Sequence, residues 1–355
     1  MTRDRSSPRR RWKRALGSVV AAEGHQGIGR RTGWRRLTVG SRFALRSPIE
    51  PVRPLFEAVG GKQRHLDETG QLRVWSRTQA PMVRIGKFDV DDVARLRAFY
   101  PDVGLALRLQ RADDTGPGVA RELEARRTIA DHAPGLAPPV VGHGAFGGSP
   151  GIAYLFEELL PARQLNAPEL ISEGLGELAA RLTELHRGFG VGSRRLDEVI
   201  SPKVPTWWSA VVPTLEIDPA IDAAVQELFE RNQELEISFG HGDLVGSNIL
   251  RADGRIVLVD WEHSQTMPIA FDLAKPLLQS ADPTAALDVL RDVLAPTVPG
   301  GPDSFALEEQ LALAYVRTLS GVASRRERAA AAGRLEALER ETQQRITLVA
   351  ALLDV

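Results

Sequence analysis

The 355-residue sequence contains no cysteine. Without thiols, the chain can hold no disulfide scaffold, no zinc–thiolate site and no cysteine nucleophile. A protein without cysteine also fits a reducing compartment, so we expect a cytoplasmic location.

Long apolar runs are missing as well. No stretch approaches 18 consecutive apolar residues, so we expect no membrane span. The N-terminus is charged and lacks the apolar core and cleavage site of a secretory signal, so we expect no export. Hydrophobic residues nonetheless make up 43% of the chain, which is enough for one large domain or two smaller lobes.

Acidic residues are scarce only at the beginning of the chain. Residues 1–50 hold 13 Lys and Arg but 3 Asp and Glu, and subtraction from the totals of 45 and 46 leaves 32 basic and 43 acidic residues in 51–355. We interpret 1–47 as a basic, disordered tail, with a nucleic-acid or anionic-membrane arm as the alternative. The acidic remainder argues against nucleic-acid binding by the rest of the protein.

The order of the expected elements indicates an α+β protein. Apolar runs predict strands over 71–77, 81–88, 104–110 and 151–163 and a strand within 134–144, and helical patterns cover 89–100, 119–132 and most of the chain after 263. Ile171, Leu175, Leu178, Leu182 and Leu185 form one face of a further helix. Strands come early and helices late, which predicts a lobe over 48–158 and a helical lobe over 159–355.

A hairpin within 239–263 gathers the polar residues of greatest interest. Asp253-Gly254 separates "NIL" from "RIVLVD", a strong signal for a tight turn. Antiparallel pairing about this turn places Asn248 opposite a residue within one position of Asp260. Both side chains carry oxygen, and Mg²⁺ prefers one or two such ligands together with phosphate oxygens and water.

Asp243 lies on the loop that enters this hairpin, five residues before Asn248. A carboxylate there can accept the proton of a substrate hydroxyl and aim the hydroxyl at a phosphorus atom. We expect His241 to be structural. The alternative interpretation of the whole segment is an ordinary Asp-Gly hairpin with polar ends.

"HGDLVGSNIL", "VLVDWEHS" and "AFDLAK" resemble the aminoglycoside phosphotransferase and choline-kinase-like family, whose members are relatives of the protein kinases. Upstream, "LALRLQ", "VARELEARRTIADHAPGLAPPVV", "YLFEELLPA" and "LAARLTELH" resemble further family segments in the family's order. The resemblance covers about residues 104–280. It implies a two-lobed protein-kinase-like fold, with a small sheet-rich N-lobe and a larger helical C-lobe.

The resemblance also implies roles for single residues in the C-lobe. Asp243 would be the catalytic base or hydroxyl-orienting residue, and Asn248 and Asp260 would hold Mg²⁺ against the nucleotide phosphates. Asp272 would hold the catalytic loop through backbone hydrogen bonds. Glu262 would contact metal or substrate, or would be an exposed acid after the strand.

In the N-lobe, the resemblance implies that Arg108 contacts the nucleotide phosphates. A charge within an apolar strand needs a partner, and we prefer Glu122 to Glu124 for that partner. The backbone of the segment from Glu157 to Leu159 would bind adenine.

Two features depart from the family pattern. Val245-Gly246-Ser247 stands where the family usually has His-Pro-Gly, although the spacing between Asp243 and Asn248 is kept. The best candidate for the glycine loop that covers the phosphates is Gly60 and Gly61, with a simple surface turn as the alternative.

The function that follows is a small-molecule kinase, which uses ATP or GTP and Mg²⁺ to phosphorylate a hydroxyl of an aminoglycoside, amino-alcohol or sugar. Its partners would be a nucleotide and a small hydroxylated substrate. A non-catalytic nucleotide-binding or regulatory protein and a nucleotidyl transferase remain as alternatives. Trp207 and Trp208 either stack on a sugar ring or pack in the core, and we prefer the core.

Overall fold

The computed structural model describes residues 34–38, 82–86, 95–100, 105–111, 118–146, 152–331 and 333–355. Contacts divide the chain into two compact units, which comprise residues 1–127 with 137–161 and residues 128–136 with 162–355. Most of the tail predicted over 1–47, the strand predicted over 71–77, and Gly60 and Gly61 lie outside the described residues. Because much of the lobe predicted over 48–158 lies outside the described residues, the division into lobes over 48–158 and 159–355 stays a prediction.

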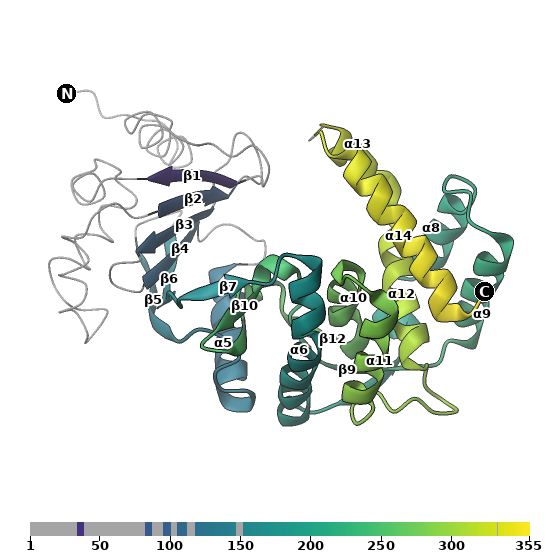
Figure 1. The fold of residues 1–355 in the computed structure, drawn as a ribbon, viewed down its shortest axis with the longest axis horizontal. Helices are drawn as coiled ribbons and strands as arrows, with labels where there is room; N and C mark the ends of the chain where they lie inside the picture. Colours follow the sequence, from purple (N-terminus) through teal and green to yellow (C-terminus); the bar gives the residue numbers. More distant parts are fainter. Residues whose placement is uncertain are drawn as a thin grey trace, which may run out of the picture. The chain divides into compact units, whose positions relative to one another are not determined.

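The first unit is built on an antiparallel sheet with the strand order β1-β2-β3-β4-β6-β5 (Figure 1). Its elements are β1 (Trp34–Thr38), β2 (Met82–Gly86), β3 (Arg95–Tyr100), β4 (Leu105–Arg111), β5 (Val140–Phe146), β6 (Ile152–Glu158) and α5 (Val119–His132) as far as residue 127, the remainder of α5 belonging to the second unit. The expected strands at β2, β4, β5 and β6 and the expected helix α5 are confirmed.

The helix expected over 89–100 is wrong where the structure describes it, because Arg95–Tyr100 forms β3. This strand pairs along its length with β4 on one side and with β2 on the other. Polar and apolar residues alternate in "RLRA" (95–98), which is the period of a strand. Pairing on both edges satisfies the backbone of β3 and overrides the local helical preference.

The second unit contains two small sheets, β11-β10-β7 and β12-β9-β8. Their strands are β7 (Ala162–Gln164), β8 (Gly192–Arg195), β9 (Glu234–Gly240), β10 (Ile249–Ala252), β11 (Arg255–Leu258) and β12 (Gln265–Pro268). The predicted hairpin is confirmed, since β10 and β11 pair from Ala252↔Arg255 to Ile249↔Leu258.

The helices of the second unit are α6 (Pro168–Phe189), α7 (Leu196–Val199), α8 (Val204–Val211), α9 (Pro219–Arg231), α10 (Ile269–Gln279), α11 (Pro283–Leu294), α12 (Leu307–Ser320), α13 (Val322–Ala331) and α14 (Leu335–Leu353). The apolar face predicted for α6 is buried, with Leu178 and Leu182 at its centre. Helix α12 packs against α8, α10 and α14, and α6 packs against α11 (Figure 1).

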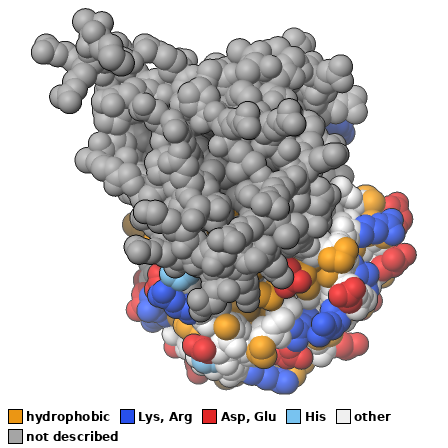
Figure 2. Space-filling view, turned by 90° about the vertical axis from the view of Figure 1, so that its left-hand side faces the viewer, with side chains coloured by type: hydrophobic (Ala, Val, Ile, Leu, Met, Phe, Trp, Pro, Cys, Tyr) orange, Lys and Arg blue, Asp and Glu red, His pale blue; other side chains and the backbone are white. Residues whose placement is uncertain are grey.

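The described surface carries both signs of charge, with basic and acidic side chains interspersed on the face drawn in Figure 2. No helix in the described part of the chain combines the length and the apolar character needed to cross a bilayer.

Candidate active site

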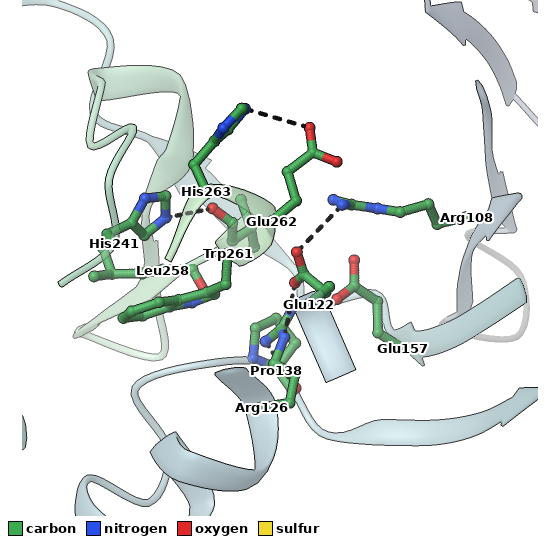
Figure 3. A network of polar contacts seen from close by, with 11 residues as sticks. Arg108, Glu122, Arg126, Pro138, Glu157, His241, Leu258, Trp261, Glu262 and His263 are labelled. Atoms are coloured by element: carbon green, nitrogen blue, oxygen red, sulfur yellow. Dashed lines mark hydrogen bonds and ion pairs between the residues drawn. The ribbon is translucent and has the colours of Figure 1, made fainter. Parts of the chain in front are cut away.

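A buried charge network lies within the first unit, around Glu122 on α5 (Figure 3). Arg108 of β4 donates from Nη1 to Oε2 of Glu122 at 3.2 Å, which confirms the preferred pairing. Arg126, one turn along α5, donates from Nε to Oε1 of Glu122 at 2.9 Å. Both carboxylate oxygens of Glu122 thus accept from guanidinium groups, as a fully buried acid requires.

Arg126 extends this network to the segment that we expect to bind adenine. Its guanidinium donates to the carbonyl oxygen of Pro138 at 3.1 Å and forms an ion pair with Glu157. The sequence patterns considered above did not single out Arg126, although its i,i+4 spacing from Glu122 is the usual signal for a helical ion pair.

The three residues of the segment that we expect to bind adenine differ in how their backbones are paired. The backbone of Glu157 lies inside the sheet, between Ala106 and Val140, and the N–H of Glu158 donates to the carbonyl oxygen of Pro139 at 3.0 Å. The chain leaves β6 at Leu159. Leu159 is therefore the first residue of the segment whose backbone lies beyond the strand.

The second unit contains the loop that joins β9 to β10, which comprises residues 241–248 and is here called the catalytic loop after the role predicted for Asp243. His241 is fully buried, and its Nδ1 accepts from the N–H of Asp243 at 3.3 Å. Its Nε2 lies 2.9 Å from the carbonyl oxygen of Val259, an oxygen that can only accept, so this nitrogen donates the hydrogen bond (Figure 3). These contacts fit the structural role expected for His241.

Asp272 on α10 holds the beginning of the catalytic loop. Its Oδ1 accepts from the N–H of Gly242 at 2.8 Å, and its Oδ2 accepts from the N–H of His241. Burial raises the pKa of the Asp272 carboxyl, while electrostatic attraction to His241 and the two backbone hydrogen bonds oppose this rise. The predicted clamp of the loop by Asp272 is confirmed.

Asn248 closes the catalytic loop and faces the second strand of the hairpin. Its Nδ2 donates to the carbonyl oxygen of Asp243 at 2.9 Å, which leaves Oδ1 as the end able to bind a cation. Its own carbonyl oxygen accepts from the N–H of Val259 at 3.0 Å. Asn248 thus lies opposite the residue before Asp260, which confirms the predicted pairing.

Asp260 lies two residues after the end of β11, directly before the 3-10 helix Trp261–His263, and adopts a left-handed conformation with φ of 72°. This conformation is costly for most residues with a Cβ atom, but Asp adopts it more readily than most. The indole of Trp261 fixes the next position, since it is fully buried and donates to the carbonyl oxygen of Leu258 at 3.0 Å. The same indole packs on the rings of His241 and Phe239, at centroid distances of 4.6 and 6.2 Å.

Glu262 follows in the 3-10 helix Trp261–His263. It is buried, so its interpretation as an exposed acid is wrong. One carboxylate oxygen lies 3.7 Å from Nε2 of His263 (Figure 3).

The donor set at this end of the hairpin fits Mg²⁺. Asn248 and Asp260 offer hard oxygen atoms, the kind of ligand that this ion takes from proteins. The described residues include no cluster of three or more His, Cys, Asp or Glu that could hold a metal ion without further ligands. A cation here would need oxygen atoms from a substrate, as phosphates provide.

Lys275 of α10 is a second site residue that the sequence patterns did not single out. Its Nζ forms an ion pair with Oδ1 of Asp243. No short-range sequence pattern predicts this contact, because 32 positions separate the two residues.

The two tryptophans of α8 have different environments. Trp208 is fully buried and its Nε1 donates to Oδ1 of Asp222 at 2.9 Å, which confirms core packing for this residue. Trp207 is 45% exposed and is not a core residue.

A family model described as "Phosphotransferase enzyme family" (APH) matches residues 95–307. Among curated proteins, "Probable choline kinase 1" of Arabidopsis thaliana is 28% identical over 137 residues. This match covers 35% of the present chain and 39% of the plant protein, so the chain spans about two fifths of that relative.

Similar solved structures include a choline/ethanolamine kinase family protein from Mesorhizobium loti, at 16% identity and a TM-score of 0.44, covering 73% of this chain and 90% of that one. A glucosamine kinase in complex with glucosamine, ADP and inorganic phosphate is 15% identical with a TM-score of 0.48, covering 81% of this chain and 84% of that one.

Proposed function

The chain belongs to the phosphotransferase enzyme family, and from this premise we propose that it transfers the γ-phosphoryl group of ATP or GTP to a hydroxyl of a small acceptor. The arrangement of Asp243, Asn248 and Asp260 carries the proposal. The loop and hairpin that bear them are held by Asp272 and Trp261 through buried hydrogen bonds. Phosphoryl transfer depends mainly on positioning and charge stabilisation, and this site supplies a preorganised set of oxygen ligands.

In the proposed reaction, Asp243 accepts a hydrogen bond from the acceptor hydroxyl and aims its oxygen at the γ-phosphorus. The new O–P bond forms as the bond from the γ-phosphorus to the β–γ bridging oxygen breaks, which releases ADP or GDP. The hydroxyl proton passes to the Asp243 carboxylate and from there to water. Asn248 and Asp260 would hold Mg²⁺, which neutralises charge on the phosphate oxygens when it is bound.

We propose that the first unit binds the rest of the nucleotide. Arg108, fixed by Glu122, would contact the phosphates, and the backbone at Leu159 would contact the base. Glu157 would act through Arg126 rather than through its own backbone, because that backbone belongs to the sheet. Gly60 and Gly61 remain our candidates for the glycine loop.

The test is a product assay with purified protein, Mg²⁺ and either ATP or GTP, supplied with choline, glucosamine, an amino-propanol or an aminoglycoside. We expect ADP or GDP together with one phosphorylated acceptor, and a kcat lower by about 10²- to 10⁴-fold in Asp243→Asn. Release of pyrophosphate would instead indicate nucleotidyl transfer. Failure of every acceptor with both nucleotides would contradict the proposal.

A further inference from the structure

One face of α10 contacts the catalytic loop at three points. Asp272, Lys275 and Gln279 are spaced by three and four residues, so they lie on the same side of the helix. Asp272 accepts from two backbone N–H groups at the beginning of the loop. Lys275 contacts the carboxylate of Asp243, and Oε1 of Gln279 accepts from the N–H of Gly246 at 3.1 Å.

We propose that Lys275 is a positioning residue that fixes the carboxylate of Asp243 for phosphoryl transfer. This inference rests on the proposed function. Among the three contacts, the Lys275 contact is the one that reaches the reacting side chain, whereas Asp272 and Gln279 hold only backbone.

The exposure of the pair argues against a role in folding. The side chains of Lys275 and Asp243 are 47% and 39% exposed. Ion pairs that are this open to water contribute little to stability, because solvent screens them and both side chains lose freedom. Oriented beside a reacting hydroxyl, the same pair has a chemical use. Lys275 occupies Oδ1 and leaves Oδ2 to accept the hydroxyl proton, and its positive charge offsets the repulsion between the carboxylate and a phosphate.

The backbone that carries Lys275 is fixed from the core. The hydroxyl of Tyr315 on α12 donates to the carbonyl oxygen of Ala274, the residue before Lys275, at 2.7 Å. Tyr315 is almost fully buried, and α10 packs against α12. The backbone from which the Lys275 side chain projects is therefore held in place by the core. A fixed backbone favours precise placement of the Asp243 carboxylate that Lys275 contacts.

The first experiment compares the kinetics of Lys275→Ala, Lys275→Arg and the wild type, with Lys203→Ala as a matched exposed lysine. We expect Lys275→Ala to lower kcat by about 10- to 100-fold, as a misplaced reacting group does, while the KM for the nucleotide changes by less than about twofold. Lys275→Arg should restore most of the kcat, and Lys203→Ala should leave it unchanged. The Tm of Lys275→Ala should stay within about 2 °C of the wild type.

A kcat of Lys275→Ala within about twofold of the wild type would overturn the inference. So would a loss of kcat that arginine does not restore and that a lower Tm accompanies, since this pattern indicates a structural role.

A second experiment examines the ion pair without using activity. The rate at which an amine-reactive ester labels each lysine is followed by mass spectrometry in the wild type and in Asp243→Asn. We expect several-fold faster labelling of Lys275 in the variant and an unchanged rate at Lys203. An unchanged labelling rate at Lys275 in Asp243→Asn would contradict the inference even if the protein is an active kinase. A wild type with no nucleotide turnover would contradict the proposed function, and with it the positioning role of Lys275 in phosphoryl transfer.

Discussion

Gly242 lies at a crowded point of the catalytic loop. Its φ is 78°, a conformation that residues with a Cβ atom rarely adopt. A Cβ atom at this position would meet the carbonyl oxygen of His263 at 2.2 Å, well below a normal contact distance. The close approach of two backbone segments, and not conformation alone, therefore demands glycine before Asp243.

Substitution by alanine separates these two effects. Gly254 has a φ of 77°, and nothing lies within 4 Å of the position that a Cβ atom would take, so Gly254→Ala should cost only about 1–2 kcal/mol of unfolding free energy. Gly242→Ala adds the clash and should cost more, with at least about a tenfold loss of kcat as Asp243 shifts. Urea unfolding measures the loss of unfolding free energy, and the product assay measures kcat. Equal losses of unfolding free energy in Gly242→Ala and Gly254→Ala would contradict the argument.

His186 on α6 is buried, and its Nδ1 has no hydrogen-bond partner in the described part of the chain. Burial lowers the pKa of His186 from 6.5 to about 4, so the ring is neutral in the folded protein at pH 7. Between pH 6.5 and about 4, the unfolded chain binds a proton that the folded protein does not. His186 therefore makes stability fall as the pH decreases through this window.

We expect His186→Phe to remove up to about 3 kcal/mol of the acid destabilisation between pH 6.5 and about 4. Urea unfolding at a series of pH values measures this dependence. His143→Phe, at an exposed position, is the matched control and should keep the wild-type slope. An unchanged slope in His186→Phe would show that the buried ring is protonated or that it titrates normally.

At the scale of the element, α5 holds a buried network rather than a simple apolar face. Arg126→Ala would remove one of the cations that contact the buried carboxylate of Glu122 and would break the ion pair between Arg126 and Glu157. We expect a loss of about 3–5 kcal/mol of unfolding free energy, as for other broken buried ion pairs. Arg127→Ala changes the exposed neighbour and should cost less than about 0.5 kcal/mol. Similar costs in urea unfolding would contradict a special role for Arg126.

Local patterns predicted the elements whose partners are near in sequence. The Asp253-Gly254 turn and the spacing of apolar residues in α6 are local signals, and both elements formed as expected. The strand β3 was predicted as a helix, because its identity depends on β4 and β2 lying on either side. Tertiary pairing of this kind leaves only a weak mark in a single sequence.

The same limit applies to the candidate site. Asp243, Asn248 and Asp260 belong to one loop and one hairpin, so their spacing suggested a common site. Lys275 reaches Asp243 across 32 residues and leaves no such signal. Arg126 could have been predicted from the sequence, since it lies at the i,i+4 position from Glu122 on the same helix.

At the scale of the whole molecule, nucleotide binding should appear as added stability. A nucleotide at about 100 times its Kd that binds only the folded state adds about 2.7 kcal/mol to the unfolding free energy. We expect Mg²⁺ with ATP or GTP to raise the Tm of the wild type, and we expect this effect to be lost in Asp260→Asn.

Asp253→Asn is the matched control for this thermal shift. It makes the same chemical change at the other end of the same hairpin, and Asp253 also has a positive φ, of 48°. Asparagine tolerates this conformation, so both variants should fold. A thermal shift that persists in Asp260→Asn, or disappears in Asp253→Asn, would contradict the assignment of Asp260 as a metal ligand.

The contacts described for the catalytic loop come from the second unit itself, from α10, from the carbonyl oxygen of Val259 and from the indole of Trp261. In evolutionary terms, these contacts tie α10 to the chemical step. A substitution on the loop-facing side of α10 reaches the loop that bears Asp243 directly, because Asp272, Lys275 and Gln279 all contact it. Selection on the chemical step should therefore constrain this side of α10 as well as the loop.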